Sequence, residues 1–281
     1  MSRVRRHQHH NLPAHRTRLI GREHEVEAIR QALLRSDGRL VTLTGAGGCG
    51  KTRLALRVAA DLVDGFVDGV WLVELAPLAD PALVPEAVAT ALGVREQPAK
   101  PMLDTLVTSL KSRRLLLVLD NCEHLVDGCA HLADVGLGRC ASIRLLVTSR
   151  QPLGIEGEMI WRVPPLALTD VLSPSLDELV RSPAVQLFVE RALAVQPAFE
   201  LTGQNAPIIG KICRRLDGLP LGIELAAARL RALGLEQILE RLDASIGMLM
   251  GSSRTAPDRQ RTMQATLDWS HTLLRRCVQG T

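Results

Sequence analysis

The sequence predicts an α/β fold, in which a parallel sheet covered by helices precedes a small all-α domain. Before Pro164, short apolar runs rich in β-branched residues alternate with segments of helical period, as in parallel sheets with helices on both faces. Beyond the Pro-, Ser- and Asp-rich stretch 169–177, only helical periodicity remains. A hydrophobic fraction of 46% and a charged fraction of 23% over 281 residues are typical of a globular chain with more than one domain.

The first part of the chain contains five candidate strands with helical segments before and between them. The strands are predicted at 39–44, 70–75, 114–119, 143–148 and 159–163. Apolar residues at helical spacing predict helices at 23–34, 52–63, 83–92, 102–111 and 122–136. In such a sheet, a ligand is expected at the carboxyl ends of the strands.

The second part reads as a helical bundle. Helices are predicted at 183–195, 204–216, 221–233 and 235–242, and short turns carry Gly203, Gly218 and Gly234. The polar segment 251–260 is a predicted linker. The expected organisation is a basic flexible arm at 1–18, a nucleotide-binding domain at 19–168, a helical domain at 169–250 and a linker with further chain at 251–281.

A glycine-rich loop follows the first predicted strand and carries the strongest functional signal. It fits the pattern G-x-x-x-x-G-K-[ST], in which backbone N–H groups and the start of the next helix hold phosphates. Lysine at the seventh position reaches the β and γ phosphates, and the hydroxyl at the eighth binds Mg²⁺. The loop residues are Gly45, Ala46, Gly47, Gly48, Cys49, Gly50, Lys51 and Thr52.

An acid ends the third predicted strand, which has the form of a Walker B segment. The run Leu115–Leu119 is continuously apolar and is followed by Asp120, a carboxylate suited to the Mg²⁺ coordination shell. Acids are common at strand ends, so Asp120 alone is weak evidence for a nucleotide site. It becomes strong evidence because the glycine-rich loop precedes it in the same chain. Together they predict ATP or ADP with Mg²⁺, and Thr52 and Asp120 as the metal-binding residues. No N-K-x-D motif for reading guanine follows the fourth strand.

With these motifs in order, the chain resembles the NB-ARC-like signal-transduction (STAND) P-loop ATPases. It is most similar to the ATPase module of large LuxR-type and antibiotic-regulatory bacterial transcriptional regulators. The resemblance rests on Leu19–Glu23, on the "LDNCEHL" run Leu119–Leu125, on Thr148-Ser149-Arg150 and on the "GLPL" run Gly218–Leu221. It implies a P-loop NTPase sheet of the ASCE type, then the helical domain and the start of a winged-helix domain.

The resemblance also implies roles for individual residues. Arg150 is implied to contact the γ-phosphate, and a guanidinium at a strand tip is suited to sensing its loss. Pro220 is implied to pack near the adenine. The remaining residues expected beside the nucleotide are Ile20, Arg22 and Arg53.

Two departures from the family pattern affect function. Asn121 follows Asp120 where the family often has a second acid, so the candidate general base is Glu123 and we expect slow hydrolysis. The segment Thr262–Ser270 is similar to the start of a winged-helix domain, but the chain ends at Thr281. We therefore expect a truncated switch module that depends on protein partners or on absent sensor and DNA-binding domains.

Three functions remain open at this point. The first is an ATP-dependent switch in transcriptional regulation, with slow Mg²⁺-dependent hydrolysis and assembly on ATP. The second is an interaction scaffold that holds ADP or ATP without turnover. The third, direct nucleic-acid binding through the arm, which has six arginines and no acid in residues 1–22, is disfavoured because aromatic residues are few. Without a membrane-length apolar run or signal peptide, we expect a cytoplasmic protein.

Overall fold

The computed structural model describes residues 10–14, 17–168 and 175–252. The chain divides into two compact units. The first comprises the residues up to Gly45 together with Lys51–Val163, and the second comprises Ala46–Gly50 and the residues from Pro164 onward. The division falls at Val163–Pro164, a few residues before the predicted boundary at 168. The predicted winged-helix start lies outside the described residues, as do all of the predicted 251–281 segment except Gly251 and Ser252.

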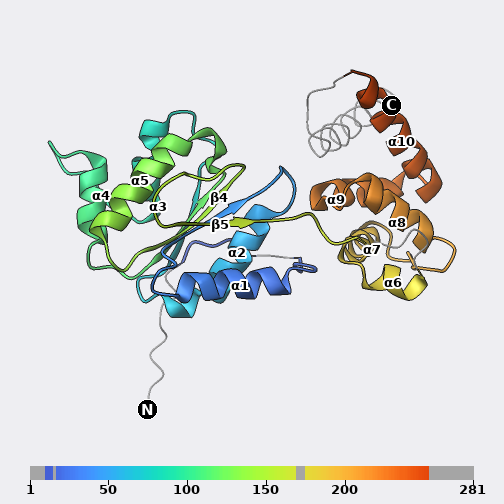
Figure 1. The fold of residues 1–281 in the computed structure, drawn as a ribbon, viewed down its shortest axis with the longest axis horizontal. Coiled ribbons are helices and arrows are strands. Elements are labelled where there is room, and N and C mark those ends of the chain that lie inside the picture. Colours follow the sequence, from blue (N-terminus) through green and yellow to red (C-terminus); the bar gives the residue numbers. More distant parts are fainter. Residues whose placement is uncertain (1–9, 15–16, 169–174, 253–281) are drawn as a thin grey trace, which may run out of the picture. The chain divides into compact units, whose positions relative to one another are not determined.

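The first unit is built on a five-stranded parallel sheet (Figure 1). Its strands are β1 (Leu40–Thr44), β2 (Val70–Glu74), β3 (Leu116–Asp120), β4 (Arg144–Ser149) and β5 (Glu158–Arg162). Their order is β2-β3-β4-β1-β5, so β4 separates the strand before the phosphate loop from the strand that ends in Asp120. All five predicted strands are present, each shifted by two residues or fewer at its start. The predicted α/β class and P-loop NTPase fold are confirmed.

Helices cover both faces of this sheet. Helices α1 (Glu23–Leu34) and α2 (Lys51–Asp61) lie on one face, and α3 (Val84–Ala91), α4 (Met102–Leu110) and α5 (Val126–Arg139) lie on the other (Figure 1). Leu117 and Leu119 of β3 join the apolar core beneath α3–α5. Leu116 and Val118 alternate with them and are equally buried, because a central strand of a covered parallel sheet is apolar on both sides.

The helix predicted at 122–136 is wrong at its start. Residues Cys122–His124 form a separate 3₁₀ turn, η3, and α5 begins only at Val126. Asn121 has the left-handed backbone φ 67°, ψ 51°, which a helix cannot propagate through. The chain therefore makes a sharp turn directly after Asp120.

Residues 10–14, which the sequence placed in a flexible arm, are held along β2. His10 forms a parallel bridge with Val70. The Asn11 side chain donates from Nδ2 to the Leu72 carbonyl (2.8 Å) and accepts from the Leu72 amide (2.6 Å). The Asn11 side-chain amide thus forms hydrogen bonds with both the backbone N–H and the backbone C=O of Leu72. A further strand paired with the edge strand β2 would form the same two bonds.

The second unit is helical after Pro164. Its helices are α6 (Leu176–Arg181), α7 (Pro183–Val195), α8 (Ala206–Arg215), α9 (Pro220–Ala228) and α10 (Leu235–Ser252). Helix α10 is ten residues longer than the predicted 235–242 and includes the first residues of the predicted linker. The added residues include Ala244, Met248 and Leu249, which are strong helix formers that outweigh Gly247. No described helix is both long enough and apolar enough to cross a bilayer.

Gly218 is required by the turn between α8 and α9. Its φ is +66°, and a Cβ there would lie 2.4 Å from the carbonyl oxygen of Leu166. The Gly218 carbonyl accepts from the Leu166 amide at 2.9 Å, so the two backbones cannot easily separate. We expect Gly218→Ala to lower the free energy of unfolding by at least about 2 kcal/mol.

Denaturant unfolding of a matched pair measures this effect. The control is Gly93→Ala, because Gly93 has the same φ of +66° but nothing within 4 Å of an added Cβ. Gly93→Ala introduces only backbone strain and no steric clash, so it should lower the free energy of unfolding less than Gly218→Ala does. Equal losses in both variants would show that the approach of Leu166 does not constrain this turn.

Candidate functional site

The glycine-rich loop joins β1 to α2 with three glycines at positive φ. Gly45, Gly48 and Gly50 have φ values of 153°, 74° and 96°, and glycine adopts such angles at little cost. Lys51 begins α2 and is only 9% exposed. Its Nζ donates to the Gly45 carbonyl at 2.9 Å, so the ammonium folds back over its own loop. A positive charge and a helix start therefore converge on one cradle, which fits a phosphate chain.

Thr52 and Asp120 meet beside this cradle. The Thr52 hydroxyl donates to Asp120 Oδ1 at 2.7 Å, across 68 residues of sequence. A hydroxyl and a carboxylate at the carboxyl edge of the sheet are the oxygen ligands that Mg²⁺ prefers. The residues present thus fit the predicted metal, and Lys51, Thr52 and Asp120 form one cluster.

Thr148, which was named only as part of the Thr148-Ser149-Arg150 run and had no predicted role, also contacts Asp120. The Thr148 hydroxyl on β4 lies 2.6 Å from Asp120 Oδ1 and 2.9 Å from the Asn121 amide nitrogen. The available signal was a threonine near the end of a buried strand. Only the sheet order places β4 beside β3 and makes that threonine a neighbour of the acid.

Arg150 is engaged by Glu123. The Nε of Arg150 donates to Glu123 Oε1 at 3.1 Å, while Glu123 Oε2 is buried and has no hydrogen-bond partner. The arginine side chain is 63% exposed and the glutamate 18%. Such a partly exposed ion pair contributes little stability. The two residues are therefore brought together, in a contact that a competing anion can break at low cost.

Arg22 and Arg53 are both in contact with neighbouring residues. Arg22 is buried and forms an ion pair with Glu25 at 2.7 Å. Arg53 donates from Nη2 to the Thr17 hydroxyl (2.9 Å) and the Arg18 carbonyl (2.8 Å). Arg53 thereby ties α2 to the segment before α1. Ile20 is half-buried in that segment.

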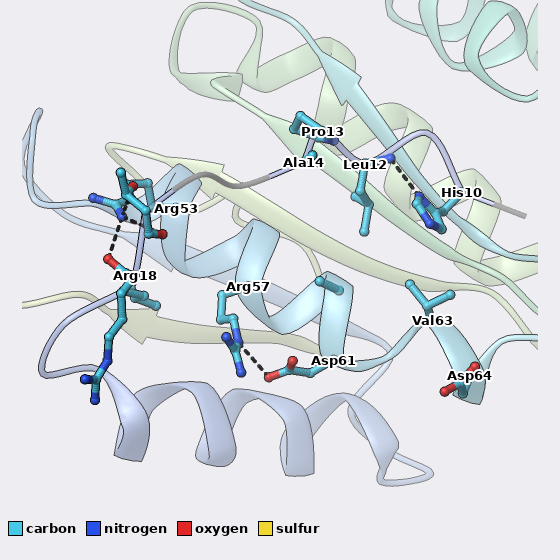
Figure 2. A pocket seen from close by; sticks show the side chains of 13 residues that line it. His10, Leu12, Pro13, Ala14, Arg18, Arg53, Arg57, Asp61, Val63 and Asp64 are labelled. Atoms are coloured by element: carbon cyan, nitrogen blue, oxygen red, sulfur yellow. Dashed lines mark hydrogen bonds and ion pairs between the residues drawn. The ribbon is translucent and has the colours of Figure 1, made fainter. Parts of the chain in front are cut away.

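A cavity of about 680 Å³ lies between this N-terminal segment and α2 (Figure 2). Arg53 lines one end of the cavity, and Asp64 lines the other end. Arg53 directly follows Thr52 in the chain, so this end is the one nearer to the glycine-rich loop. Along α2, the Arg57 Nε pairs with Asp61 at 3.0 Å. The sequence does not indicate this cavity, because the composition of residues 1–18 predicts a flexible arm. Its lining residues are His10, Leu12, Pro13, Ala14, Thr17, Arg18, Leu19, Arg53, Arg57, Ala60, Asp61, Val63 and Asp64.

Pro220 begins α9 within the second unit, which also includes loop residues 46–50. In that unit the Leu221 amide donates to the Gly48 carbonyl at 3.2 Å. A Cβ at Gly50 would lie 3.9 Å from Pro220 Cγ. The "GLPL" run is therefore a neighbour of the loop glycines.

Part of the chain is similar to a known protein family. Residues 34–155 match the family described as "AAA domain". This segment, a little under half of the chain, is therefore similar to AAA-type P-loop ATPase domains, in agreement with the parallel sheet and the glycine-rich loop described above. The match covers both the phosphate loop and the strand that ends in Asp120.

Two of three curated relatives of this chain are named as regulators. The chain is 45% identical over 244 residues to a putative HTH-type transcriptional regulator of Mycobacterium tuberculosis, covering 87% of this chain and 26% of the relative. It is 42% identical over 265 residues to an uncharacterized M. tuberculosis protein, covering 94% and 64%. The regulatory protein AfsR of Streptomyces griseus is 30% identical over 233 residues, covering 79% and 22%. The chain thus spans about a quarter of the first relative's length.

Solved structures support the fold. The chain of Drosophila ORC bound to DNA gives a TM-score of 0.53 at 14% identity, covering 84% of this chain and 69% of that one. A Pyrococcus horikoshii STAND protein with a tetratricopeptide repeat sensor gives 0.51 at 13% identity, covering 90% and 40%. At these identities the likeness concerns the fold alone.

Proposed function

We propose that this chain is the ATP-binding switch module of a transcriptional regulator. The observation that carries the proposal is the contact of 2.7 Å between the Thr52 hydroxyl and Asp120 Oδ1, beside Lys51. In this role Lys51 and the loop amides hold the phosphates, and Thr52 and Asp120 hold Mg²⁺. The bound metal supplies charge neutralisation during phosphoryl transfer.

The Arg150–Glu123 ion pair supplies the switching element of this proposal. A terminal phosphate competes with Glu123 for the Arg150 guanidinium, because arginine binds phosphate and carboxylate through the same donors. Loss of the phosphate returns Arg150 to Glu123. The two pairings are two states that ATP and ADP favour differently, which is what a nucleotide switch requires.

The regulatory output is proposed from the relatives. The M. tuberculosis relative is named as a putative HTH-type transcriptional regulator, and the described residues contribute an ATPase sheet and a helical bundle. We propose the finer assignment to the NB-ARC-like STAND group and the LuxR-type regulators from the "LDNCEHL" and "GLPL" runs. In this proposal, other domains or partner proteins contact DNA and sense the signal. The protein acts in the cytoplasm and forms oligomers when ATP binds.

A second function, a scaffold that holds ADP without turnover, is favoured by Asn121. The amide replaces the second acid that could polarise water, and Glu123 is occupied by Arg150. The first experiment is therefore to release and identify the nucleotide from purified protein and then to assay Mg²⁺-dependent ATP hydrolysis. Tightly held ADP with no turnover would support the scaffold, and slow turnover would support the switch.

Glu123→Gln tests the proposed general base. Loss of a positioned base lowers a rate by about 100-fold or more, whereas the amide oxygen still accepts from Arg150. We expect ATP hydrolysis to fall by about that factor with ATP affinity nearly unchanged. The matched control is Glu156→Gln, at an exposed glutamate before β5. Unchanged hydrolysis in Glu123→Gln would assign the base to another group.

A further inference from the structure

The Thr148 hydroxyl connects the two residues that end β3. Thr148 lies on the central strand β4 and is 1% exposed. Its Oγ1 accepts the Asn121 amide proton at 2.9 Å and lies 2.6 Å from Asp120 Oδ1. The last paired residues of the two strands are Leu119 and Val147, so Asp120 and Thr148 follow as neighbours at the sheet edge.

The direction of these hydrogen bonds follows from proton counting. A backbone amide can only donate, so the Asn121 N–H occupies a lone pair of the Thr148 oxygen. An ionised carboxylate can only accept. The one hydroxyl proton of Thr148 therefore points to Asp120 Oδ1, and the hydroxyl has a single hydrogen-bonding arrangement.

The same contact stabilises the turn that follows Asp120. Asn121 adopts the left-handed backbone conformation at φ 67°, ψ 51°, which asparagine tolerates better than most residues but less easily than glycine. The Thr148 oxygen is the hydrogen-bond acceptor of this residue's amide. Loss of that acceptor would leave the amide of this turn residue unsatisfied and would loosen the carboxylate before it.

Thr52 and Thr148 both donate to Asp120 Oδ1, but they differ in burial. Thr52 is exposed at the start of α2, whereas Thr148 is buried in the sheet. In the proposed function the Thr52 hydroxyl turns to the metal. The Thr148 contact is then the one that keeps Asp120 in place with or without nucleotide.

We infer that Thr148 is a positioning residue that fixes the Asp120 carboxylate for Mg²⁺ through its buried hydroxyl. The inference rests on the proposed function of Asp120 as a metal-binding residue. Residues that orient a metal ligand typically contribute roughly 10- to 100-fold to metal affinity or activity. Thr148 acts on the metal through Asp120 and does not contact nucleotide in this assignment.

Two substitutions separate the hydroxyl from the shape of the side chain. Thr148→Val keeps the branched shape without the hydroxyl, and Thr148→Ser keeps the hydroxyl without the methyl group. The measurement is the Mg²⁺ concentration that half-saturates ATP hydrolysis, or Mg²⁺-dependent ATP binding where turnover is too slow. We expect Thr148→Val to raise this concentration by roughly 10- to 100-fold and Thr148→Ser to stay close to the wild-type value. ADP binding measured in EDTA should be the same in all three proteins.

Thr42→Val is the matched control. Thr42 lies on the neighbouring strand β1, is fully buried and has a hydroxyl with no hydrogen-bond partner. The same chemical change in the same sheet should leave the Mg²⁺ requirement unaltered. If Thr148→Val does not fold, Thr148→Ser and Thr148→Ala still differ only by the hydroxyl and give the same comparison.

The outcomes distinguish this inference from the function on which it rests. A folded Thr148→Val protein with the wild-type Mg²⁺ requirement would overturn the positioning role and leave the proposed function intact. An equal rise in Thr42→Val would also overturn it, since any buried hydroxyl would then suffice. A wild-type protein that binds no nucleotide, with or without Mg²⁺, would refute the proposed function itself and the inference with it.

Discussion

Lys51→Ala is expected to lower ATP hydrolysis by at least about 100-fold and to weaken ATP binding strongly. Lys51 is nearly buried at the start of α2, and its ammonium is already held over the loop by the Gly45 carbonyl. In the proposed function, its charge is already in place beside the phosphates and needs no further ordering. Removal of one such preorganised donor typically costs a factor of about 100 to 1,000 in rate. Affinity for a fluorescent ATP analogue and the steady-state rate measure the two effects.

Two control variants make the Lys51 result specific. Lys211→Ala removes an exposed lysine of α8 and should leave binding and turnover at wild-type values. Lys51→Arg keeps the charge but not the compact ammonium, so it should bind ATP better than Lys51→Ala and turn over more slowly than wild type. Normal ATP affinity in Lys51→Ala would show that the loop does not hold the phosphates.

Asp120→Asn is expected to remove the Mg²⁺-dependent part of ATP hydrolysis, with a loss of about 100-fold or more. The substitution preserves shape, and the amide oxygen still accepts from Thr148 and Thr52, so the fold should persist. What is lost is the negative charge that the metal requires. Nucleotide binding in EDTA should be retained, because Lys51 and the loop glycines are unchanged.

Asp134→Asn is the control for this variant, since Asp134 is exposed on α5. The informative measurement is hydrolysis over a range of Mg²⁺ and Mn²⁺ concentrations, together with thermal unfolding of each protein. A wild-type Mg²⁺ response in Asp120→Asn would exclude this carboxylate from the metal site. If Asp120→Asn and Asp134→Asn lose thermal stability equally, the loss of hydrolysis would reflect destabilisation of the fold and not loss of a metal ligand.

The local sequence was sufficient to predict the positions of most strands and helices. Continuous apolar runs such as Leu115–Leu119 occur where a strand is buried on both faces, and the described sheet buries this run completely. Helix α7 has the predicted bounds 183–195 because Pro183 can occupy only the first turn. The prediction was less accurate where no strong stop was present, as at the end of α10.

The turn after Asp120 shows why local pattern was insufficient nearby. Residues 122–136 have helical spacing, yet the left-handed Asn121 and the separate turn η3 delay α5 to Val126. The Asn121 amide is held by Thr148, a residue of another strand. Asparagine tolerates the left-handed conformation locally, but the hydrogen bond that holds its amide joins residues 27 apart in the sequence, and the pattern of 122–136 does not show it.

By itself, the sequence determined the α/β class and the order of elements, and it located the glycine-rich loop, because hydrophobic period and the spacing of glycine, lysine and threonine are local properties. Tertiary structure alone decided which of the distant side chains meet. The order β2-β3-β4-β1-β5 puts Thr148 against Asp120, the turn η3 puts Glu123 against Arg150, and Asn11 attaches the N-terminal segment to β2. Each contact is set by sheet order and by backbone hydrogen bonds between distant segments, which the residue pattern of either segment does not contain.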